Sequence, residues 1–338
     1  MIIVLKPNTR NEDRQTLLEA ISKRGLKPVE FAGTERSTIH VLGDVNESVA
    51  ESMKSFECVE NVLRILKPYK LASKEHQSQK TVVKVGDVSF GNGEFTIIAG
   101  PCSVESEAQV MESAHMLKKL GIKIMRASAF KPRTSPYDFQ GMGIEGLKLL
   151  KKVREETGML VETEIMDVRD VKIAAECVDI LRVGARNMQN FDLLKELGKI
   201  DKPVILKRGM SATINEFIMA AEYILLHGNR RVILCERGIR TFETAYRNTL
   251  DLGAVAVLRT LTHLPIIVDP SHAAGKRDLV PPLCKAAAAV GADGLLVEAH
   301  PHPDQALSDG AQSLTPEQLA KLMEELRPLC IAVGRRLA

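Results

Sequence analysis

The sequence contains no tryptophan, and aromatic residues make up only 4% of its 338 residues. Few side chains are therefore available for stacking on nucleic acid bases, and a net charge of +3 is too small to indicate a nucleic acid partner. No apolar run approaches the roughly 18 residues needed to span a membrane. Met1 opens a short strand-like run instead of a signal peptide. We therefore expect a soluble, cytoplasmic protein without a nucleic acid or membrane partner.

Paired cysteine motifs are also missing. The six cysteines are scattered without a Cys-x-x-Cys pair, and four of them lie in apolar surroundings, which disfavours a disulfide framework. At this length the chain can bury enough apolar surface for one large and one small domain without covalent staples.

Eight short apolar runs dominate residues 95–338, and stretches with helical apolar spacing separate them. Because each run has about four residues between glycine, proline or charged residues, we interpret the runs as buried strands. The roughly 240 residues involved match the usual size of a (β/α)₈ barrel. The runs are 95–98, 122–125, 159–161, 178–181, 204–206, 232–234, 265–268 and 294–297.

Residues 1–66 follow a different pattern. Strand-like runs at 2–5, 29–31, 37–42 and 58–66 alternate with helical segments at 11–24 and 46–56. This βαββαβ order predicts a small, separate ferredoxin-like domain. Residues 67–80 are polar and resemble a linker. Residues 81–94 alternate around two glycine-containing turns, which predicts a hairpin that plugs the bottom of the barrel.

Polar residues follow the expected strands, and in a closed barrel they would meet at one rim. Cys102 follows the first strand, His272 the seventh, and Glu298 and Asp309 the eighth. One thiol, one imidazole and two carboxylates suit a divalent ion such as Mn²⁺, Fe²⁺, Co²⁺ or Zn²⁺. Taken alone, Cys102 would by default be a buried structural cysteine, but its place at the rim with the other three residues favours a ligand. The later His300 and His302 are flanked by prolines, and we interpret them as loop residues with ligation as a lesser alternative.

A second group at the same rim is cationic. Any one of these residues could be an ordinary surface charge, but their repetition at strand ends predicts a site for a polyanion or for two phosphorylated ligands. Glu162 and Glu164 after the third strand could hold these cations in place or take part in proton transfer. The cations are Arg126, Lys131, Arg133, Arg186, Lys207, Arg208, Arg237 and Arg240.

Seven motifs in order make the chain similar to a known family. They start at Ala99-Gly100-Pro101-Cys102, Lys131-Pro132-Arg133-Thr134, Gly184-Ala185-Arg186-Asn187, Leu206-Lys207-Arg208-Gly209, Cys235-Glu236-Arg237-Gly238, Asp269-Pro270-Ser271-His272 and Ala306-Leu307-Ser308-Asp309. Together they resemble 3-deoxy-D-arabino-heptulosonate 7-phosphate (DAHP) synthase, in its shorter type Iβ branch. The resemblance covers essentially the whole chain, because some members have an N-terminal ferredoxin-like regulatory domain.

The resemblance implies an activity. Members of the family are transferases that condense phosphoenolpyruvate with erythrose 4-phosphate in the first step of the shikimate pathway, which leads to the aromatic amino acids. It also implies one divalent metal ion, a homo-oligomer, by resemblance a tetramer, and feedback by an aromatic amino acid, tyrosine or phenylalanine, through residues 1–66.

Residue roles follow from the matched motifs. The metal ligands would be Cys102, His272, Glu298 and Asp309. Lys131 would protonate the new alkoxide, and either Glu164 or Asp269 would assist the attacking water. Arg133 and Thr134 would face the phosphate of the aldose. Phosphoenolpyruvate would be bound by Arg126, Lys131, Arg186, Lys207 and Arg237.

Two alternatives remain. The related 3-deoxy-D-manno-octulosonate 8-phosphate synthase uses arabinose 5-phosphate, but it typically has an Asn-Arg-Ser loop where this chain has Pro132-Arg133-Thr134. A catalytically silent, amino-acid-binding protein would be expected to have lost a ligand or a cation. One departure from the family pattern is that Ala127-Ser128 stands where many members have Gly-Gly.

Overall fold

The computed structural model describes residues 1–32, 36–43, 45–63 and 68–338. The chain divides into two compact units, Met1–Lys70 and Leu71–Ala338. The expected boundary at residue 66 and the last three residues of the expected strand 58–66 lie outside the described residues.

The first unit has the predicted βαββαβ order. Its elements are β1 (Ile2–Leu5), α1 (Asn11–Ser22), β2 (Lys27–Ala32), β3 (Ser37–Leu42), α2 (Glu47–Lys54) and β4 (Val59–Leu63). The four strands form one antiparallel sheet in the order β2-β3-β1-β4. This is the ferredoxin-like arrangement, so the prediction for this domain's fold is confirmed.

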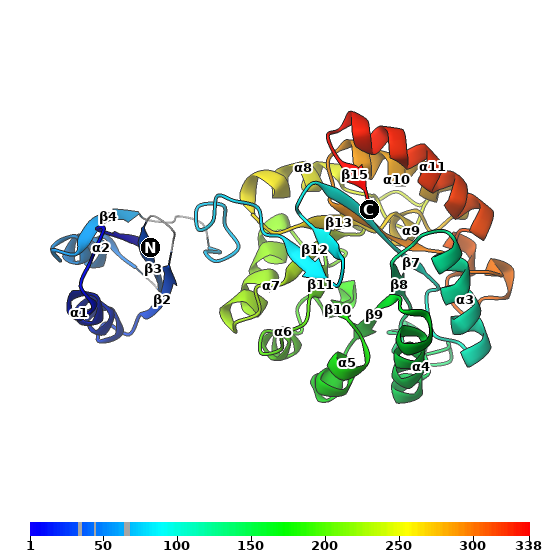
Figure 1. Cartoon of the computed structure of the whole chain (residues 1–338), viewed down its shortest axis with the longest axis horizontal. Coiled ribbons are helices and arrows are strands. Elements are labelled where there is room, and N and C mark those ends of the chain that lie inside the picture. The colour runs from blue at the N-terminus through cyan, green and yellow to red at the C-terminus, as the bar shows by residue number, and fades with distance from the viewer. Residues whose placement is uncertain (33–35, 44, 64–67) are drawn as a thin grey trace. The chain divides into compact units, whose positions relative to one another are not determined.

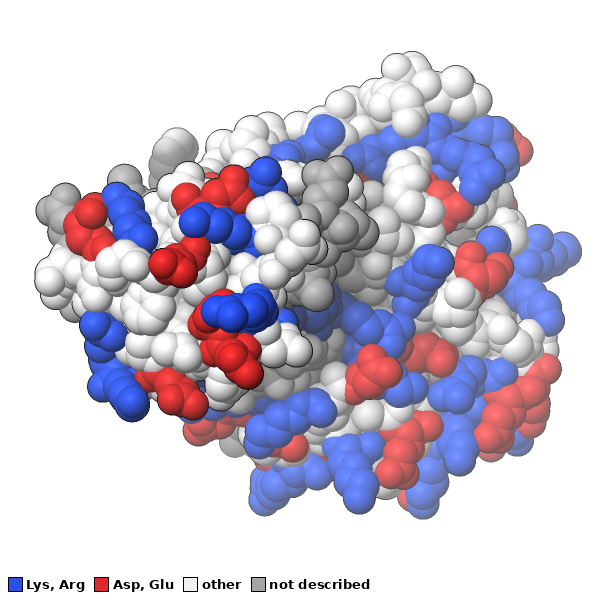
Figure 2. Space-filling model, turned by 60° about the vertical axis from the view of Figure 1, so that its left-hand side comes forward, with Lys and Arg blue, Asp and Glu red and all other residues white. Residues whose placement is uncertain are grey.

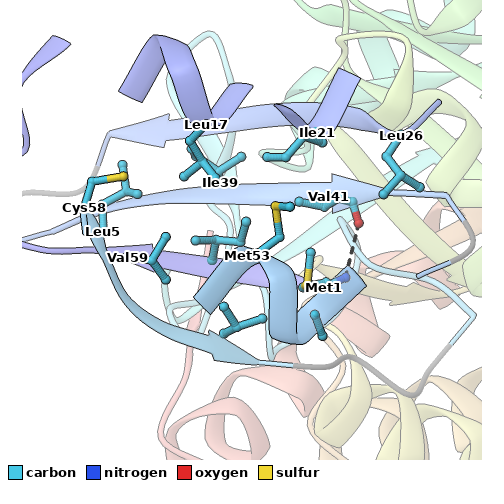
Figure 3. Packing of buried hydrophobic residues seen from close by; sticks show 13 residues of the cluster. Met1, Leu5, Leu17, Ile21, Leu26, Ile39, Val41, Met53, Cys58 and Val59 are labelled. Carbon is cyan, nitrogen blue, oxygen red and sulfur yellow. Dashed lines mark hydrogen bonds between the residues drawn. The ribbon is translucent and has the colours of Figure 1, made fainter. Parts of the chain in front are cut away.

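The core of this unit is a layer of apolar side chains between the sheet and its two helices. Figure 3 shows Leu17 and Ile21 of α1 pointing towards Ile39 of β3, with Met53 of α2 beside them. The amino group of Met1 donates a hydrogen bond of 3.2 Å to the carbonyl oxygen of Val41. Met1 is thereby hydrogen-bonded to strand β3 of the sheet.

The second unit is a closed barrel of eight parallel strands. Each strand pairs with its neighbour in chain order, and β14 pairs with β7 to close the ring. All eight predicted strands are present, so the predicted (β/α)₈ fold is confirmed. The strands are β7 (Glu94–Gly100), β8 (Ile124–Arg126), β9 (Leu160–Ile165), β10 (Ile180–Val183), β11 (Val204–Lys207), β12 (Val232–Glu236), β13 (Ile266–Val268) and β14 (Gly294–Glu298).

Helices surround the barrel (Figure 1). The signals that end and begin them are visible: Gly158 ends α4 in the left-handed region with φ 71°, and Thr315 forms a capping box ahead of Pro316. The helices are α3 (Glu107–Lys119), α4 (Gly143–Thr157), α5 (Val171–Cys177), α6 (Phe191–Leu197), α7 (Ile214–Leu226), α8 (Leu252–Leu261), α9 (Pro270–Ala274), α10 (Val280–Ala289) and α11 (Pro316–Ala332), and a short strand β15 (Arg336–Leu337) pairs with β7.

A hairpin of β5 (Val83–Val85) and β6 (Val88–Phe90) precedes the barrel. Its buried apolar side chains form one cluster with inward residues of the barrel strands, among them Ile98, Ile205 and Ile267. Isoleucine side chains from many strands therefore fill the barrel interior at the end that the hairpin covers. The polar side chains lie at the other end, the rim formed by the carboxyl ends of the strands.

The polar segment 67–80 is not a free linker over its described length. The backbone N–H groups of Leu71 and Ala72 donate to the carboxylate of Glu222 in α7, at 2.7 and 2.9 Å. The Nε2 atom of His263 lies 2.7 Å from the carbonyl oxygen of Leu71, and Ser73 forms a bridge with Thr262. The polar composition of residues 67–80 predicted a linker, and backbone groups of Leu71 and Ala72 bind its described part to the barrel.

Within the described residues, no helix is both long and apolar enough to cross a membrane. Figure 2 shows basic side chains intermingled with acidic ones on the face that it presents, as the small net charge suggests. Examples in the first unit are the pairs Arg10–Asp13 and Arg14–Glu30.

Candidate active site

The chemically useful side chains gather at the carboxyl ends of the barrel strands. Arg126, Lys207 and Glu298 are the last residues of β8, β11 and β14. Cys102 and Arg237 lie just beyond β7 and β12, Glu164 lies within β9, and the other predicted site residues follow in the loops or short helices. The barrel therefore brings to one rim the residues that its sequence places after successive strands.

Four of these residues form a compact group of potential metal ligands. One ligand atom from each of Cys102, His272, Glu298 and Asp309 lies within 4.8 Å of the others. They are the four residues predicted from the sequence as ligands. His300 and His302 stay outside this group, and their nearest acidic partners are Glu105 and Glu112.

The donor atoms of the group face one another. The Cys102 thiol donates to Asp309 Oδ2 at 3.0 Å. His272 Nε2 lies 3.4 Å from Glu298 Oε1 and 3.8 Å from Asp309 Oδ2. Glu298 Oε1 is buried and accepts no hydrogen bond from the described residues. A buried carboxylate oxygen without a donor is costly unless a cation binds it.

Burial keeps two members of this group neutral. It raises the pKa of the Cys102 thiol to about 12, and the nearby Glu298 carboxylate adds to the shift. Burial also lowers the pKa of His272 to about 4, although nearby carboxylates oppose the shift. A neutral imidazole has a free lone pair for a metal ion, whereas the thiol must lose its proton when a metal binds.

Further residues orient this group. Asp269 Oδ1 accepts from the backbone N–H of His272 at 2.9 Å, and its Oδ2 lies 2.8 Å from His272 Nδ1, off the line of a good hydrogen bond. Lys207 forms an ion pair with Asp269. Gln312 Nε2 donates to Glu298 Oε2 at 2.6 Å. Asp269 and Gln312 therefore fix the orientation of the candidate ligands His272 and Glu298.

A pocket of about 200 Å³ opens beside the metal-ligand group. Basic side chains outnumber acidic ones among the residues that line it, so the pocket favours an anionic ligand. Its lining consists of Lys131, Pro132, Arg133, Thr134, Asp138, Glu164, Arg182, Gly184, Ala185, Arg186, Lys207, Arg237, Arg247, His272 and Asp309.

Two buried guanidinium groups have unused donors at this site. Arg126 is fully buried, donates to the carbonyl oxygen of Cys102 at 3.1 Å and lies 3.2 Å from Glu298 Oε1. Its Nε has no hydrogen-bond partner among the described residues, and neither has Nε of Arg237, whereas the terminal nitrogen near Glu298 makes an ion pair without hydrogen-bond geometry. Such donors are stabilised when an anion accepts their hydrogen bonds.

Lys131 connects the pocket with the metal-ligand group. Its Nζ lies 2.5 Å from Cys102 Sγ and 3.5 Å from Asp309 Oδ2. Burial opposes its charge, but the surrounding negative groups outweigh burial and raise the pKa of Lys131. The side chain is therefore a protonated ammonium group at neutral pH.

The loop after β8 forms one wall of the pocket. Arg133 makes an ion pair of 3.1 Å with Asp138, and Thr134 Oγ1 lies 3.5 Å from a terminal nitrogen of Arg186. The weak pairing of Thr134 leaves its hydroxyl available to a ligand.

Two family models together cover nearly the whole chain. The model described as the DAHP synthetase I family matches residues 69–331, and the DAHP synthase ferredoxin-like domain matches residues 1–67. The chain belongs to the DAHP synthetase I family. The family predicted from the seven motifs is confirmed.

Individual relatives of this DAHP synthetase I chain agree. It is 52% identical to phospho-2-dehydro-3-deoxyheptonate aldolase of Thermotoga maritima, over 99% of both chains. A crystal structure described as that DAHP synthase matches 100% of the present chain with TM-score 0.79. A truncated form matches 80% of it with TM-score 0.75. A 2-dehydro-3-deoxyphosphooctonate aldolase of Syntrophotalea carbinolica is 38% identical over 72% of this chain.

Three residues at the DAHP synthetase I site were not predicted from the sequence. Arg247 binds Asp309 and Gln312 at 3.2 and 2.9 Å. Arg182 of β10 binds Glu162 and Glu164. A signal existed for Arg182, because a charged residue directly after an apolar strand run must find partners when both faces of the strand are buried. Arg247 lies in a loop and Gln312 at the end of a 3₁₀ helix of three residues (Gly310–Gln312). Both segments are too short for a sequence period to indicate which way a side chain points.

Proposed function

We propose that this chain catalyses the condensation of phosphoenolpyruvate with erythrose 4-phosphate and water to give DAHP and inorganic phosphate. The observation that carries the proposal is the joining of two features in one site, a mixed thiol, imidazole and carboxylate group and a strongly cationic pocket. Two phosphorylated substrates require fixed cations, and an aldehyde requires an electrophilic group.

We propose that one divalent metal ion binds Cys102, His272, Glu298 and Asp309. The proximity of their four donor atoms supports this site, and so does the buried Glu298 Oε1, which has an ion pair with Arg126 but no hydrogen bond within the described residues. A bound ion would supply Lewis acidity towards the aldehyde carbonyl of erythrose 4-phosphate. The mixed donor set suits Mn²⁺, Fe²⁺, Co²⁺ or Zn²⁺.

Phosphoenolpyruvate would occupy the cationic part of the pocket. It has a phosphate and a carboxylate, and several fixed cations are needed to neutralise both. The Nε groups of Arg126 and Arg237, which have no hydrogen-bond partner within the described residues, are suited to such oxygens. The binding set would be Arg126, Lys131, Arg186, Lys207 and Arg237.

Arg133 and Thr134 would bind the phosphate of erythrose 4-phosphate. In the condensation, C3 of phosphoenolpyruvate attacks the aldehyde carbon, and Lys131 gives a proton to the resulting alkoxide oxygen. Water then adds to C2, and phosphate leaves with cleavage of its C–O bond. Lys131 suits the donor role because it is protonated and lines the pocket.

Of the two carboxylates considered for the attacking water, we favour Glu164. Both oxygens of Asp269 are occupied by His272 and Lys207. Glu164 lines the pocket, whereas Asp269 does not. Asp269 would then position His272 and Lys207, and Glu164 would accept a proton from the water.

The first unit would regulate the barrel in response to tyrosine or phenylalanine. In the described residues its buried core is apolar, apart from His40, and the candidate ligands and cations lie in the barrel unit. A ferredoxin-like domain without such chemistry is suited to sensing an effector or to assembling a homo-oligomer.

The activity can be tested with both aldoses. Purified protein should release phosphate from phosphoenolpyruvate with erythrose 4-phosphate, much less with arabinose 5-phosphate, and neither reaction should proceed after chelation until divalent metal is restored. A preference for arabinose 5-phosphate would support the octulosonate reaction, which some relatives at 32–38% identity are named for. No turnover with either sugar would support a silent binding protein.

A further inference from the structure

Arg182 is a buried residue of the pocket lining, and all three of its guanidinium nitrogens donate hydrogen bonds. Its Nε donates to Glu162 Oε1 at 2.7 Å, and one terminal nitrogen donates to Glu164 Oε2 at 3.0 Å. The other terminal nitrogen donates to Ser128 Oγ at 2.7 Å. Only 1% of Arg182 is exposed, so the guanidinium plane has a single arrangement in which all three partners are satisfied.

The strand register places this arginine beside its glutamate partner. Arg182 of β10 is paired directly with Glu164 of β9. The second oxygen of Glu164 packs against Gly184, where an added Cβ atom would lie 2.0 Å from Oε1. Arg182 thus holds one carboxylate oxygen, and the bare backbone of Gly184 leaves room for the other at the pocket wall.

Ser128, two residues beyond the end of β8, supplies the third acceptor for Arg182. A glycine at this position could not accept that hydrogen bond, so the hydroxyl group helps to fix the guanidinium plane.

We infer that Arg182 is a positioning residue that holds Glu164 as an oriented, ionised base for the water that adds to C2 of phosphoenolpyruvate. The inference rests on the proposed function and deepens it. Arg182 acts through Glu164, and it also forms an ion pair with Glu162.

The charges around Glu164 have the right sign for this role. Burial alone would raise the pKa of Glu164, but Arg182 opposes it first, followed by Lys131 and Lys207, and the resulting pKa lies below the ordinary value. Glu162 contributes a negative charge beyond Arg182. A base must be unprotonated, so activity that depends on Glu164 should fall only in strongly acidic solution.

The test is the pH dependence of kcat for Arg182→Gln in the full chain with saturating substrates and Mn²⁺. Removing the positive charge raises the pKa of Glu164, so the acidic limb of the profile should move to higher pH by about 1 to 3 units. KM for erythrose 4-phosphate should change less than twofold, because Arg133 and Thr134 are not altered. An unmoved limb in an active variant would overturn the inference.

Glu162→Gln is the matched variant of opposite sign. It removes a negative charge near Glu164, so the acidic limb should stay in place or move to lower pH. Ser128→Ala removes an acceptor but no charge and should leave the limb where it is. A shift to higher pH in both variants would indicate general loosening of the site and contradict the proposed role of Arg182.

Thermal unfolding of each variant shows whether it folds. If Arg182→Gln does not, the double variant with Glu162→Gln avoids leaving two unpaired carboxylates, and its limb should lie above that of Glu162→Gln alone. Equal limbs would overturn the inference. Wild-type protein that forms no DAHP would overturn the proposed function itself, whereas active wild type with unshifted variants would overturn only the role of Arg182.

Discussion

The two units bury different kinds of side chain. In the first unit, His40 is the one buried polar residue among the described positions, and the rest of the buried core is apolar. The barrel unit buries many charges, including Arg126, Arg182, Lys207 and Asp269. A buried charge is stable only with partners, so each one constrains several neighbours. Side chains in the core of the first unit can therefore be replaced without effect on the chemistry. A buried charge at the barrel rim cannot be replaced without leaving its partners unpaired.

The largest effect is expected at the metal-ligand group. Cys102→Ala removes the sulfur ligand and should lower kcat by well over the roughly 100-fold typical for residues that only support a ligand. Metal content after dialysis should fall in parallel. Cys284→Ala, a buried cysteine of α10, is the matched control and should keep near-normal activity. Near-normal turnover of metal-stripped Cys102→Ala would show that this group is not a metal site.

A smaller effect, limited to one substrate, is expected from changes in the loop after β8 that carries Arg133 and Thr134. Arg133→Ala should raise KM for erythrose 4-phosphate about 10-fold to 100-fold, as expected for loss of a charge-assisted hydrogen bond worth about 1.5–3 kcal/mol. KM for phosphoenolpyruvate should change little. Arg186→Ala should show the opposite bias. Equal effects of Arg133→Ala on both substrates would rule out its assignment to the aldose phosphate.

Removing the first unit tests whether the two units have separate tasks. Because residues 71–81 are bound to the barrel, the truncated protein should begin at Leu71 and not after this segment. It should remain active and lose inhibition by tyrosine or phenylalanine, a coupling of about 1–3 kcal/mol in the full chain. If the full chain is indifferent to both at millimolar concentration, or the truncated barrel is still inhibited, the unit is an assembly element.

The smallest effect concerns acid stability of the barrel unit. Burial first, and then the nearby charge of His263, lowers the pKa of His76 to about 4. The unfolded chain binds a proton near pH 6.5 and the folded chain does not, so stability present above pH 6.5 is lost as pH falls towards 4. At pH 5 the loss should be on the order of 1–2 kcal/mol.

The measurement compares melting of the barrel unit at pH 7 and pH 5. His76→Gln should lose less stability between the two values than wild type. His115→Gln, on the exposed side of α3, is the matched control and should behave like wild type. If His76→Gln loses as much stability between pH 7 and pH 5 as wild type, the loss comes from groups other than His76.

The positions of the strands and of the candidate ligands were predictable for a common reason. Apolar runs of strand length are local, and a closed barrel brings the residues after each run to one rim. Arg182 was missed because the apolar run was ended at Leu181, one residue before the charge. The polar composition of residues 67–80 predicts a linker, but it gives no sign of the backbone hydrogen bonds from Leu71 to Glu222 and His263, because every residue type carries these backbone groups.

The sequence by itself determined the order of elements, the family and the candidate ligands and cations, because these depend on local periodicity and on motifs contiguous in the chain. Only the tertiary structure decided which partners the charges have. It separated Asp269, bound to His272 and Lys207, from Glu164, which lines the pocket. Ion pairs join residues far apart in the chain, and burial, which only the fold creates, decides which of those pairs carry energetic weight.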